Sequence, residues 1–182
     1  MNVYVTVLAI ILALSATRAQ ADVWSQSYEL EVAGKYGDAA ALFDPLLKKE
    51  PGNEFARLRR AWLHYLAGEY NDSQGDYKKA LQANPRSLDA QIGLALTLLA
   101  QQRWKEAAII ARQALEVSPW NYYAHLRLLV AEEGQGQWQT LLEHSDQLHE
   151  RYPSDATILV YRARARYWLG DMKSARDNYL QV

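Results

Sequence analysis

Four prolines recur at an interval of 34 residues, at Pro51, Pro85, Pro119 and Pro153. Three further columns keep this interval: one of large apolar side chains, one of mostly small side chains, and one of glycine interrupted by Gln102. The columns contain Tyr36, Tyr70, Trp104, Trp138 and Met172; Ala39, Ser73, Ala107, Leu141 and Ala175; and Gly34, Gly68, Gly136 and Gly170. A fixed period of this length is typical of repeat architectures. Such repeats usually present an extended binding surface, so the spacing bounds function as well as fold.

The unit between two successive prolines has the pattern of a helical hairpin. Apolar side chains recur at steps of three and four over residues 54–67, as expected for one face of a helix. They are Phe55, Leu58, Trp62, Tyr65 and Leu66. Gly68 is typical of a helix C-terminus, and a second helical pattern covers residues 70–83 before Pro85 ends it. The sequence therefore predicts an all-α chain of antiparallel helix–turn–helix units.

Two features of each unit have a packing role. A residue with a capping side chain follows each repeated proline by two positions, and it is expected to bond a free N–H in the next helix. These residues are Asn53, Ser87, Asn121 and Asp155. Small side chains at facing points, which include Ala61, Ala95 and Ala163, allow the paired helices to approach closely. We interpret the large aromatic column as packing at the start of each second helix, not as a ligand site.

With the 34-residue period, the small residue before each turn, the Gly-x-Tyr of Gly34–Tyr36 and Gly68–Tyr70, and the closing proline, the chain resembles the tetratricopeptide repeat family. The resemblance implies a right-handed superhelical solenoid of antiparallel hairpins. It covers residues 22–182 as about five repeats, at 22–53, 54–87, 88–121, 122–155 and an incomplete 156–182. It indicates the fold more strongly than the function, because the family binds many unrelated partners.

Three features depart from the repeat pattern. Pro45 falls in the second helix of the first unit and is expected to kink it by removing a backbone hydrogen bond. In the fourth unit Leu141 replaces a small residue and Ser145 an aromatic one, so we expect a more splayed hairpin. The fifth unit reaches Val182 without a closing proline or a polar capping helix. We expect either a longer protein or a last helix covered by a partner or a second copy.

Residues 1–21 have the composition of a secretory signal peptide. They contain no acid and a single base, Arg18, and an apolar run covers residues 3–16. The small residues Ala19 and Ala21 predict cleavage between Ala21 and Asp22, which leaves residues 22–182 without stable membrane insertion. The expected location is the periplasm of a Gram-negative bacterium. The alternative is an uncleaved membrane anchor, although a span needs roughly 20 apolar residues.

Composition and motifs exclude several classes of function. A formal charge of −1 gives no electrostatic basis for binding nucleic acid or anionic lipid, and the absence of cysteine excludes thiol chemistry. The four histidines have no metal-site spacing within a helix, and the isolated glycines form no phosphate-binding motif or nucleophile elbow. We therefore expect no catalytic residue, no metal and no cofactor.

The resemblance also implies a binding surface, because first helices in this family line a concave groove that holds peptides or helices. The positions that match this groove are mostly apolar and aromatic: Trp24, Tyr28, Phe55, Leu58, Trp62, Tyr65, Asp89, Ile92, Leu96, Leu99, Tyr123, Leu126, Val130, Glu133, Val160, Arg164 and Tyr167. Arg164 is the single base among them, so clamping of a carboxylate terminus has little support. The predicted ligand is an apolar helix or extended peptide of a protein partner. The simpler interpretation is packing between neighbouring first helices.

Six arginines occur in two groups, as Arg57, Arg59 and Arg60 and as Arg162, Arg164 and Arg166. Their spacing does not place them on one helical face, so we expect solvated or snorkelling side chains, not an anion site.

Three functions remain open. The leading one is a non-enzymatic interaction scaffold or adaptor in the bacterial cell envelope. The alternatives are a polysaccharide-binding or export-associated module and an assembly unit that self-associates through its C-terminal helix.

Overall fold

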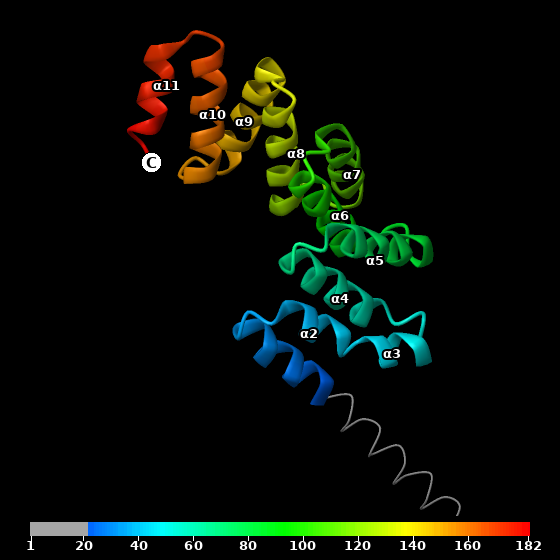
Figure 1. Ribbon diagram of the computed structural model, residues 1–182. Coiled ribbons are helices and arrows are strands. Elements are labelled where there is room, and N and C mark those ends of the chain that lie inside the picture. Colours follow the sequence, from blue (N-terminus) through cyan, green and yellow to red (C-terminus); the bar gives the residue numbers. More distant parts are fainter. Residues whose placement is uncertain (1–21) are drawn as a thin grey trace, which may run out of the picture. The chain divides into compact units, whose positions relative to one another are not determined.

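The computed structural model describes residues 22–182, so the expected signal peptide lies outside the described part of the chain. This part consists of helices joined by short turns and contains no strand (Figure 1). A helix over residues 22–32 precedes α2 (Tyr36–Ala41), α3 (Asp44–Lys49), α4 (Glu54–Leu66), α5 (Tyr70–Ala83), α6 (Leu88–Ala100), α7 (Trp104–Val117), α8 (Tyr122–Gly134), α9 (Trp138–Arg151), α10 (Ala156–Trp168) and α11 (Met172–Tyr179). None of the helices within residues 22–182 has the length and apolar character of a membrane span.

The helices form two compact units, the first ending at Ala83 and the second beginning at Asn84. In the first unit, α4 and α5 pack together as the hairpin predicted for residues 54–83, and α2 packs on α4. In the second unit, the same arrangement recurs in the pairs α6–α7 and α10–α11. The expectation of an all-α fold of antiparallel hairpins is confirmed.

The second helix of the first hairpin is interrupted, as the position of Pro45 predicted. It forms two six-residue helices, α2 and α3, with Leu42 and Phe43 between them. Pro45 lies in the first turn of α3. Backbone N–H groups in a first turn have no hydrogen-bond acceptor within the helix, so proline removes no helical hydrogen bond there. The break turns Phe43 into the core, where it is fully buried and packs edge-on against Trp24, with ring centroids 5.0 Å apart.

The small-residue columns lie inside the helix packing. All of their members are buried, including Ser73 of the first unit and Ala175 at the end of the second. Leu141 is also fully buried, within a cluster formed with Leu129, Leu148 and Ile158. The pair α8–α9 is packed less extensively than the pairs α4–α5, α6–α7 and α10–α11, which agrees with the expected splaying. The four aromatic members of the large apolar column, Tyr36, Tyr70, Trp104 and Trp138, are half-buried, whereas Met172 of the same column is largely exposed on α11.

Three of the four predicted helix caps are present. The side-chain oxygens of Asn53, Asn121 and Asp155 accept from the N–H three residues ahead, at 3.0, 2.9 and 3.0 Å. The prediction was wrong for Ser87, which takes the same extended backbone conformation but accepts no capping bond. Its side chain is shorter than that of asparagine or aspartate, and it is buried.

A second hydrogen bond, present at three of the four repeated prolines, was not visible in the sequence because the residue type changes from repeat to repeat. The side chain six positions after each of these three prolines donates to the carbonyl of that proline. Arg57 bonds to Pro51, Gln91 to Pro85 and His125 to Pro119. A proline carbonyl at the end of one hairpin is thus paired with the first helix of the next one.

Candidate partner-binding surface

The predicted groove residues belong to first helices in both units. In the first unit they lie on the helix 22–32 and on α4, which are joined through hydrogen bonds of Trp62 and Arg59. In the second unit α8 lies against both α6 and α10, so these three first helices form a row. The predicted groove residues therefore form two surfaces, one on each unit. Trp62 and Tyr65 belong to the first unit, and Ile92, Leu96 and Leu99 belong to the second.

On the first unit, Trp62 and Tyr65 stack on each other, with ring centroids 5.4 Å apart and planes 22° from parallel. The Trp62 indole N–H donates to Glu31 at 3.0 Å, so the polar edge of the ring is satisfied within the fold. Phe55 on the same helix is 75% exposed, and Leu58 is half-buried. Trp24 is half-buried and packs against the buried core cluster of this unit.

Arg59 organises the other side of this surface. Its guanidinium lies 4.0 Å from the centre of the exposed Tyr28 ring, pairs with Glu31 at 2.6 Å and donates to Ser27 at 3.0 Å. Burial raises the pKa of the Glu31 carboxyl, but hydrogen bonds from Trp62 and Arg59 outweigh it, so the pKa is lowered below 4.5. The charges beneath this aromatic surface are thereby neutralised, which leaves Tyr28 and Phe55 as its exposed apolar groups.

On the second unit, the predicted residues divide by exposure. Tyr123 on α8 is 59% exposed and Tyr167 on α10 is 50% exposed, whereas Leu99 on α6 is buried. Asp89 is exposed, and four apolar side chains between these extremes are half-buried: Ile92, Leu96, Leu126 and Val130. Leu126 packs against the core cluster around Leu129. Aromatic rings, rather than aliphatic side chains, are the most accessible apolar groups of this row.

Arg164 does not present a free positive charge. It pairs with Glu133 of α8 at 3.1 Å and lies 5.6 Å from the centre of the Tyr161 ring. Burial lowers the pKa of the Arg164 guanidinium, but its attraction to Glu133 and their hydrogen bond outweigh burial, so the pKa is raised. From the sequence alone, Arg164 could equally contact a ligand or pair with an acid on a neighbouring first helix. In the structure it pairs with Glu133.

The six arginines were expected to be solvated or snorkelling, but most of them are paired with acids within the fold. Arg57 and Arg60 pair with the buried Asp76 of α5, and Arg60 also reaches Asp44 at 2.6 Å. Arg162 and Arg166 both pair with Asp146 of α9. These acids lie on other helices, so the partners of the arginines could not be identified from spacing within one helix. The paired arginines form part of the helix packing and offer no anion site.

A family model and several solved structures match this arrangement. The model described as anaphase-promoting complex, cyclosome, subunit 3 (ANAPC3) matches residues 33–114. MamA 41-end from Desulfovibrio magneticus RS-1 superposes with a TM-score of 0.80, at 16% identity over 90% of this chain and 92% of that chain. TTC0263, a thermophilic TPR protein in Thermus thermophilus, gives a TM-score of 0.67, at 19% identity over 88% of each chain. The chain has the tetratricopeptide-repeat fold.

Two further relatives carry descriptions of binding or transport. YrrB, described as a TPR protein with an unusual peptide-binding site, gives a TM-score of 0.70, at 16% identity over 85% of this chain and 80% of that chain. The poly-beta-1,6-N-acetyl-D-glucosamine export protein of Escherichia coli (strain K12) is 27% identical over 103 residues. That match includes 54% of this chain but spans 13% of the length of the export protein.

The tetratricopeptide fold also brings together a row of hydrogen-bonded side chains that the sequence did not predict. His125 Nε2 faces the Pro119 carbonyl at 3.0 Å, His125 Nδ1 faces His144 Nε2 at 2.9 Å, and His144 Nδ1 faces Glu132 at 2.9 Å. A carbonyl only accepts, so His125 carries its proton on Nε2 and accepts from His144. His144 thus connects His125 with the buried Glu132. His125 and Glu132 lie on α8 and His144 lies on α9, so residue spacing within one helix could not predict these hydrogen bonds.

Proposed function

We propose that this protein is a non-enzymatic interaction scaffold that binds an apolar helix or extended segment of a partner protein through its first helices. The observation that carries the proposal is the exposure of Tyr123 and Tyr167 on the neighbouring helices α8 and α10. Exposed aromatic side chains of this kind are enriched at protein interfaces. The likeness to YrrB supports a peptide as ligand class.

A photo-crosslinking amino acid at position 123 or 167, with the protein expressed in its own host, tests this proposal. The matched control is position 109, because Ile109 on the second helix α7 is 54% exposed and lies outside the row of first helices. We expect a protein adduct from positions 123 and 167 and none from position 109. Equal adducts at all three positions would argue against a binding surface on the first helices.

A second candidate is a polysaccharide-associated module. The match to the poly-beta-1,6-N-acetyl-D-glucosamine export protein favours it, as do the exposed aromatic rings of Tyr167 and Trp168 on α10. We expect oligomers of N-acetylglucosamine to change the tryptophan fluorescence of the full chain, and Trp168→Ala to abolish the change. Trp120→Ala is the control, because Trp120 is 50% exposed but covered on one face by Arg151, 4.5 Å from its ring centre. Unchanged fluorescence in the wild-type protein would remove this candidate.

We further propose that the protein is exported after cleavage between Ala21 and Asp22, on the basis of the residue pattern in that segment. Sequencing the N-terminus of the protein purified from its host is the test, and Asp22 is the expected first residue.

Self-association is the third candidate function. In the crosslinking experiment, an adduct with the mass of two chains would identify it.

A further inference from the structure

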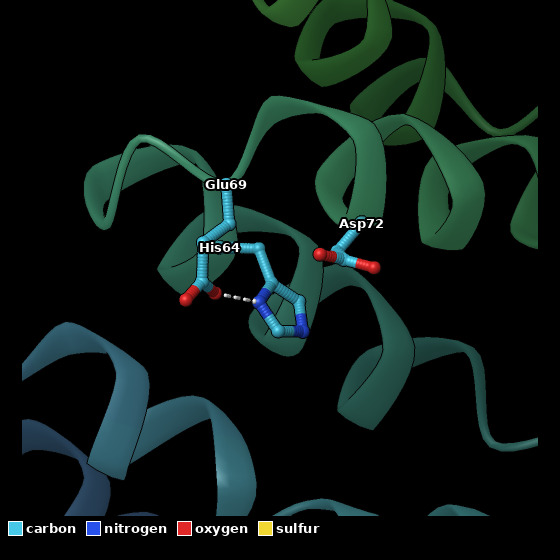
Figure 2. A group of neighbouring side chains, drawn as sticks. All are labelled: His64, Glu69 and Asp72. Carbon is cyan, nitrogen blue, oxygen red and sulfur yellow. Dashed lines mark hydrogen bonds and ion pairs between the residues drawn. The ribbon is translucent and has the colours of Figure 1, made fainter.

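Three metal-ligating side chains meet at the turn between α4 and α5. His64 lies in the last turn of α4, Glu69 in the connection and Asp72 in the first turn of α5. One ligand atom from each residue lies within 4.8 Å of the others. Figure 2 shows the His64 ring between the two carboxylates, with Nδ1 hydrogen-bonded to Glu69 at 2.6 Å.

The turn itself places these side chains. Gly68 takes a φ of +77°, which reverses the chain directly after the helix, and the Glu69 N–H bonds back to the His64 carbonyl at 2.9 Å. This bond holds the backbones of His64 and Glu69 together, and the first turn of α5 follows immediately. The ligand positions are therefore fixed by two helix ends and do not need a flexible loop to fold around an ion.

The repeats provide an internal comparison of what this turn requires. The equivalent positions in the other repeats are occupied by Leu30, Lys35 and Asp38; Leu98, Arg103 and Glu106; Glu132, Gln137 and Thr140; and Arg166, Asp171 and Ser174. The same turn thus forms with apolar, basic or amide side chains. Packing of the hairpin does not explain the combination of one imidazole and two carboxylates found at the second repeat.

The surroundings are compatible with a cation. The three residues line a surface pocket of about 480 Å³ that also contains Asp44, Asp76, Arg60 and Lys79. Arg60 is neutralised by Asp76 and Asp44, at 2.7 and 2.6 Å. Lys79 is the other base that lines the pocket. Both carboxylates are exposed, so they can adjust to an ion without breaking the core.

We propose that His64, Glu69 and Asp72 form a binding site for a divalent transition-metal ion such as Zn²⁺. Imidazole nitrogen and carboxylate oxygen bind Zn²⁺ at roughly 2.0–2.2 Å, and three protein ligands leave a coordination position for water. The ion takes the place of the proton between His64 and Glu69, and the Glu69 side chain moves outward to accommodate it. The imidazole ligand favours Zn²⁺ over Mg²⁺ or Ca²⁺, which prefer oxygen ligands alone. The site is independent of the partner-binding surface.

Titration of the metal-free full chain with Zn²⁺ against a chromogenic chelator tests the proposal. We expect one tightly bound Zn²⁺ per chain, no competition from Mg²⁺, and a loss of affinity of at least about tenfold in His64→Gln and in Asp72→Asn. Zn²⁺ should also raise the melting temperature of the wild-type protein and leave that of His64→Gln unchanged. The visible spectrum of the Co²⁺ form should change in both variants.

Two matched controls isolate the site. Asp38 occupies the same position in the first turn of α2 as Asp72 does in α5, but its repeat has no histidine. His149 is a histidine of α9, outside this cluster. Asp38→Asn and His149→Gln are expected to bind Zn²⁺ like the wild-type protein. Wild-type affinity in a folded His64→Gln, or loss of binding in His149→Gln, would overturn the assignment.

Discussion

At the scale of single residues, the position that differs most from its counterparts is Gln102. It has a φ of +57°, and it is the one residue other than glycine with a positive φ within residues 22–182. The left-handed conformation costs a residue with a Cβ about 1–2 kcal/mol. We expect Gln102→Gly to raise the free energy of unfolding by about 0.5–1 kcal/mol, since part of the relieved strain is offset by the greater freedom of glycine when unfolded. Urea denaturation measures it.

The reverse substitution is the control for this prediction. Gly68 has a φ of +77°, and a Cβ at this position would meet no atom within 4 Å. Gly68→Ala should therefore be destabilising by about 1 kcal/mol through backbone strain alone. A stability change of the same sign in both variants would contradict the strain argument.

Gln102 also shows how far the sequence could be interpreted at this scale. The period placed it in the glycine column, and its residue type made it an exception. Its backbone nonetheless follows the column, because the flanking helices α6 and α7 impose the turn whichever residue occupies it. The repeat period predicted a turn at Gln102. It did not predict the positive φ of this residue, because that conformation is imposed by the packing of the flanking helices.

At the scale of helices, two glycines with different surroundings make opposite predictions. A Cβ on Gly134, at the end of α8, would lie 2.5 Å from the Trp104 ring, whereas a Cβ on Gly75 in α5 would meet no atom within 4 Å. We expect Gly134→Ala to lower the free energy of unfolding by about 2 kcal/mol through overpacking. Gly75→Ala should raise it by about 0.5–1 kcal/mol, because alanine favours the helix. Thermal denaturation of both variants checks the pair, and a stable Gly134→Ala would disprove the close contact.

The hairpin α4–α5 depends on one buried charge. Asp76 is 3% exposed and accepts two bonds from Arg60, both at 2.7 Å, and a third from Arg57 at 3.3 Å. Removal of one partner from a buried ion pair leaves the other charges unpaired. We expect Asp76→Asn to destabilise the protein by about 3 kcal/mol, measured by urea denaturation.

Asp146 offers the matched comparison for this prediction. It also pairs with two arginines, Arg162 and Arg166, but its side chain is 41% exposed. Asp146→Asn should cost about 0–1 kcal/mol, as expected for an ion pair near solvent. Equal losses in the two variants would show that burial does not determine the strength of these pairs.

The helices were predictable from the sequence, and the contacts between them were not. Phe55, Leu58 and Trp62 revealed α4 because their spacing repeats along one helix. The partners of Arg57, Arg60 and His64 lie on other helices or in the turn, where distance depends on how the chain reverses. The cluster of His64, Glu69 and Asp72 could not be predicted for the same reason, because these residues lie on both sides of a turn and residue spacing within one helix does not relate them.

At the scale of the whole molecule, stability is expected to fall in mild acid. Burial and the neighbouring His144 lower the pKa of His125 below 6.5. Burial and Arg162 lower the pKa of His149 as well. The unfolded chain therefore binds protons that the folded chain does not, as the pH drops from about 6.5 through the folded pKa values. The free energy of unfolding decreases over this range.

Denaturation midpoints at a series of pH values measure this effect. His125→Gln is the matched variant, because Gln91, one repeat earlier, makes the same bond to its proline carbonyl at 3.0 Å. We expect this variant to fold and to lose less stability in acid than the wild-type protein. Identical pH profiles would rule out His125 as a source of the acid sensitivity.

The interruption between α2 and α3 has a consequence for the order in which the protein forms. Each helix has six residues, and isolated helices shorter than roughly 12 residues are marginal in water. Phe43 and Leu47 find their partners Ala56 and Leu63 on α4, which the ribosome makes later. The core of the first hairpin is therefore complete only after α4 has been synthesised.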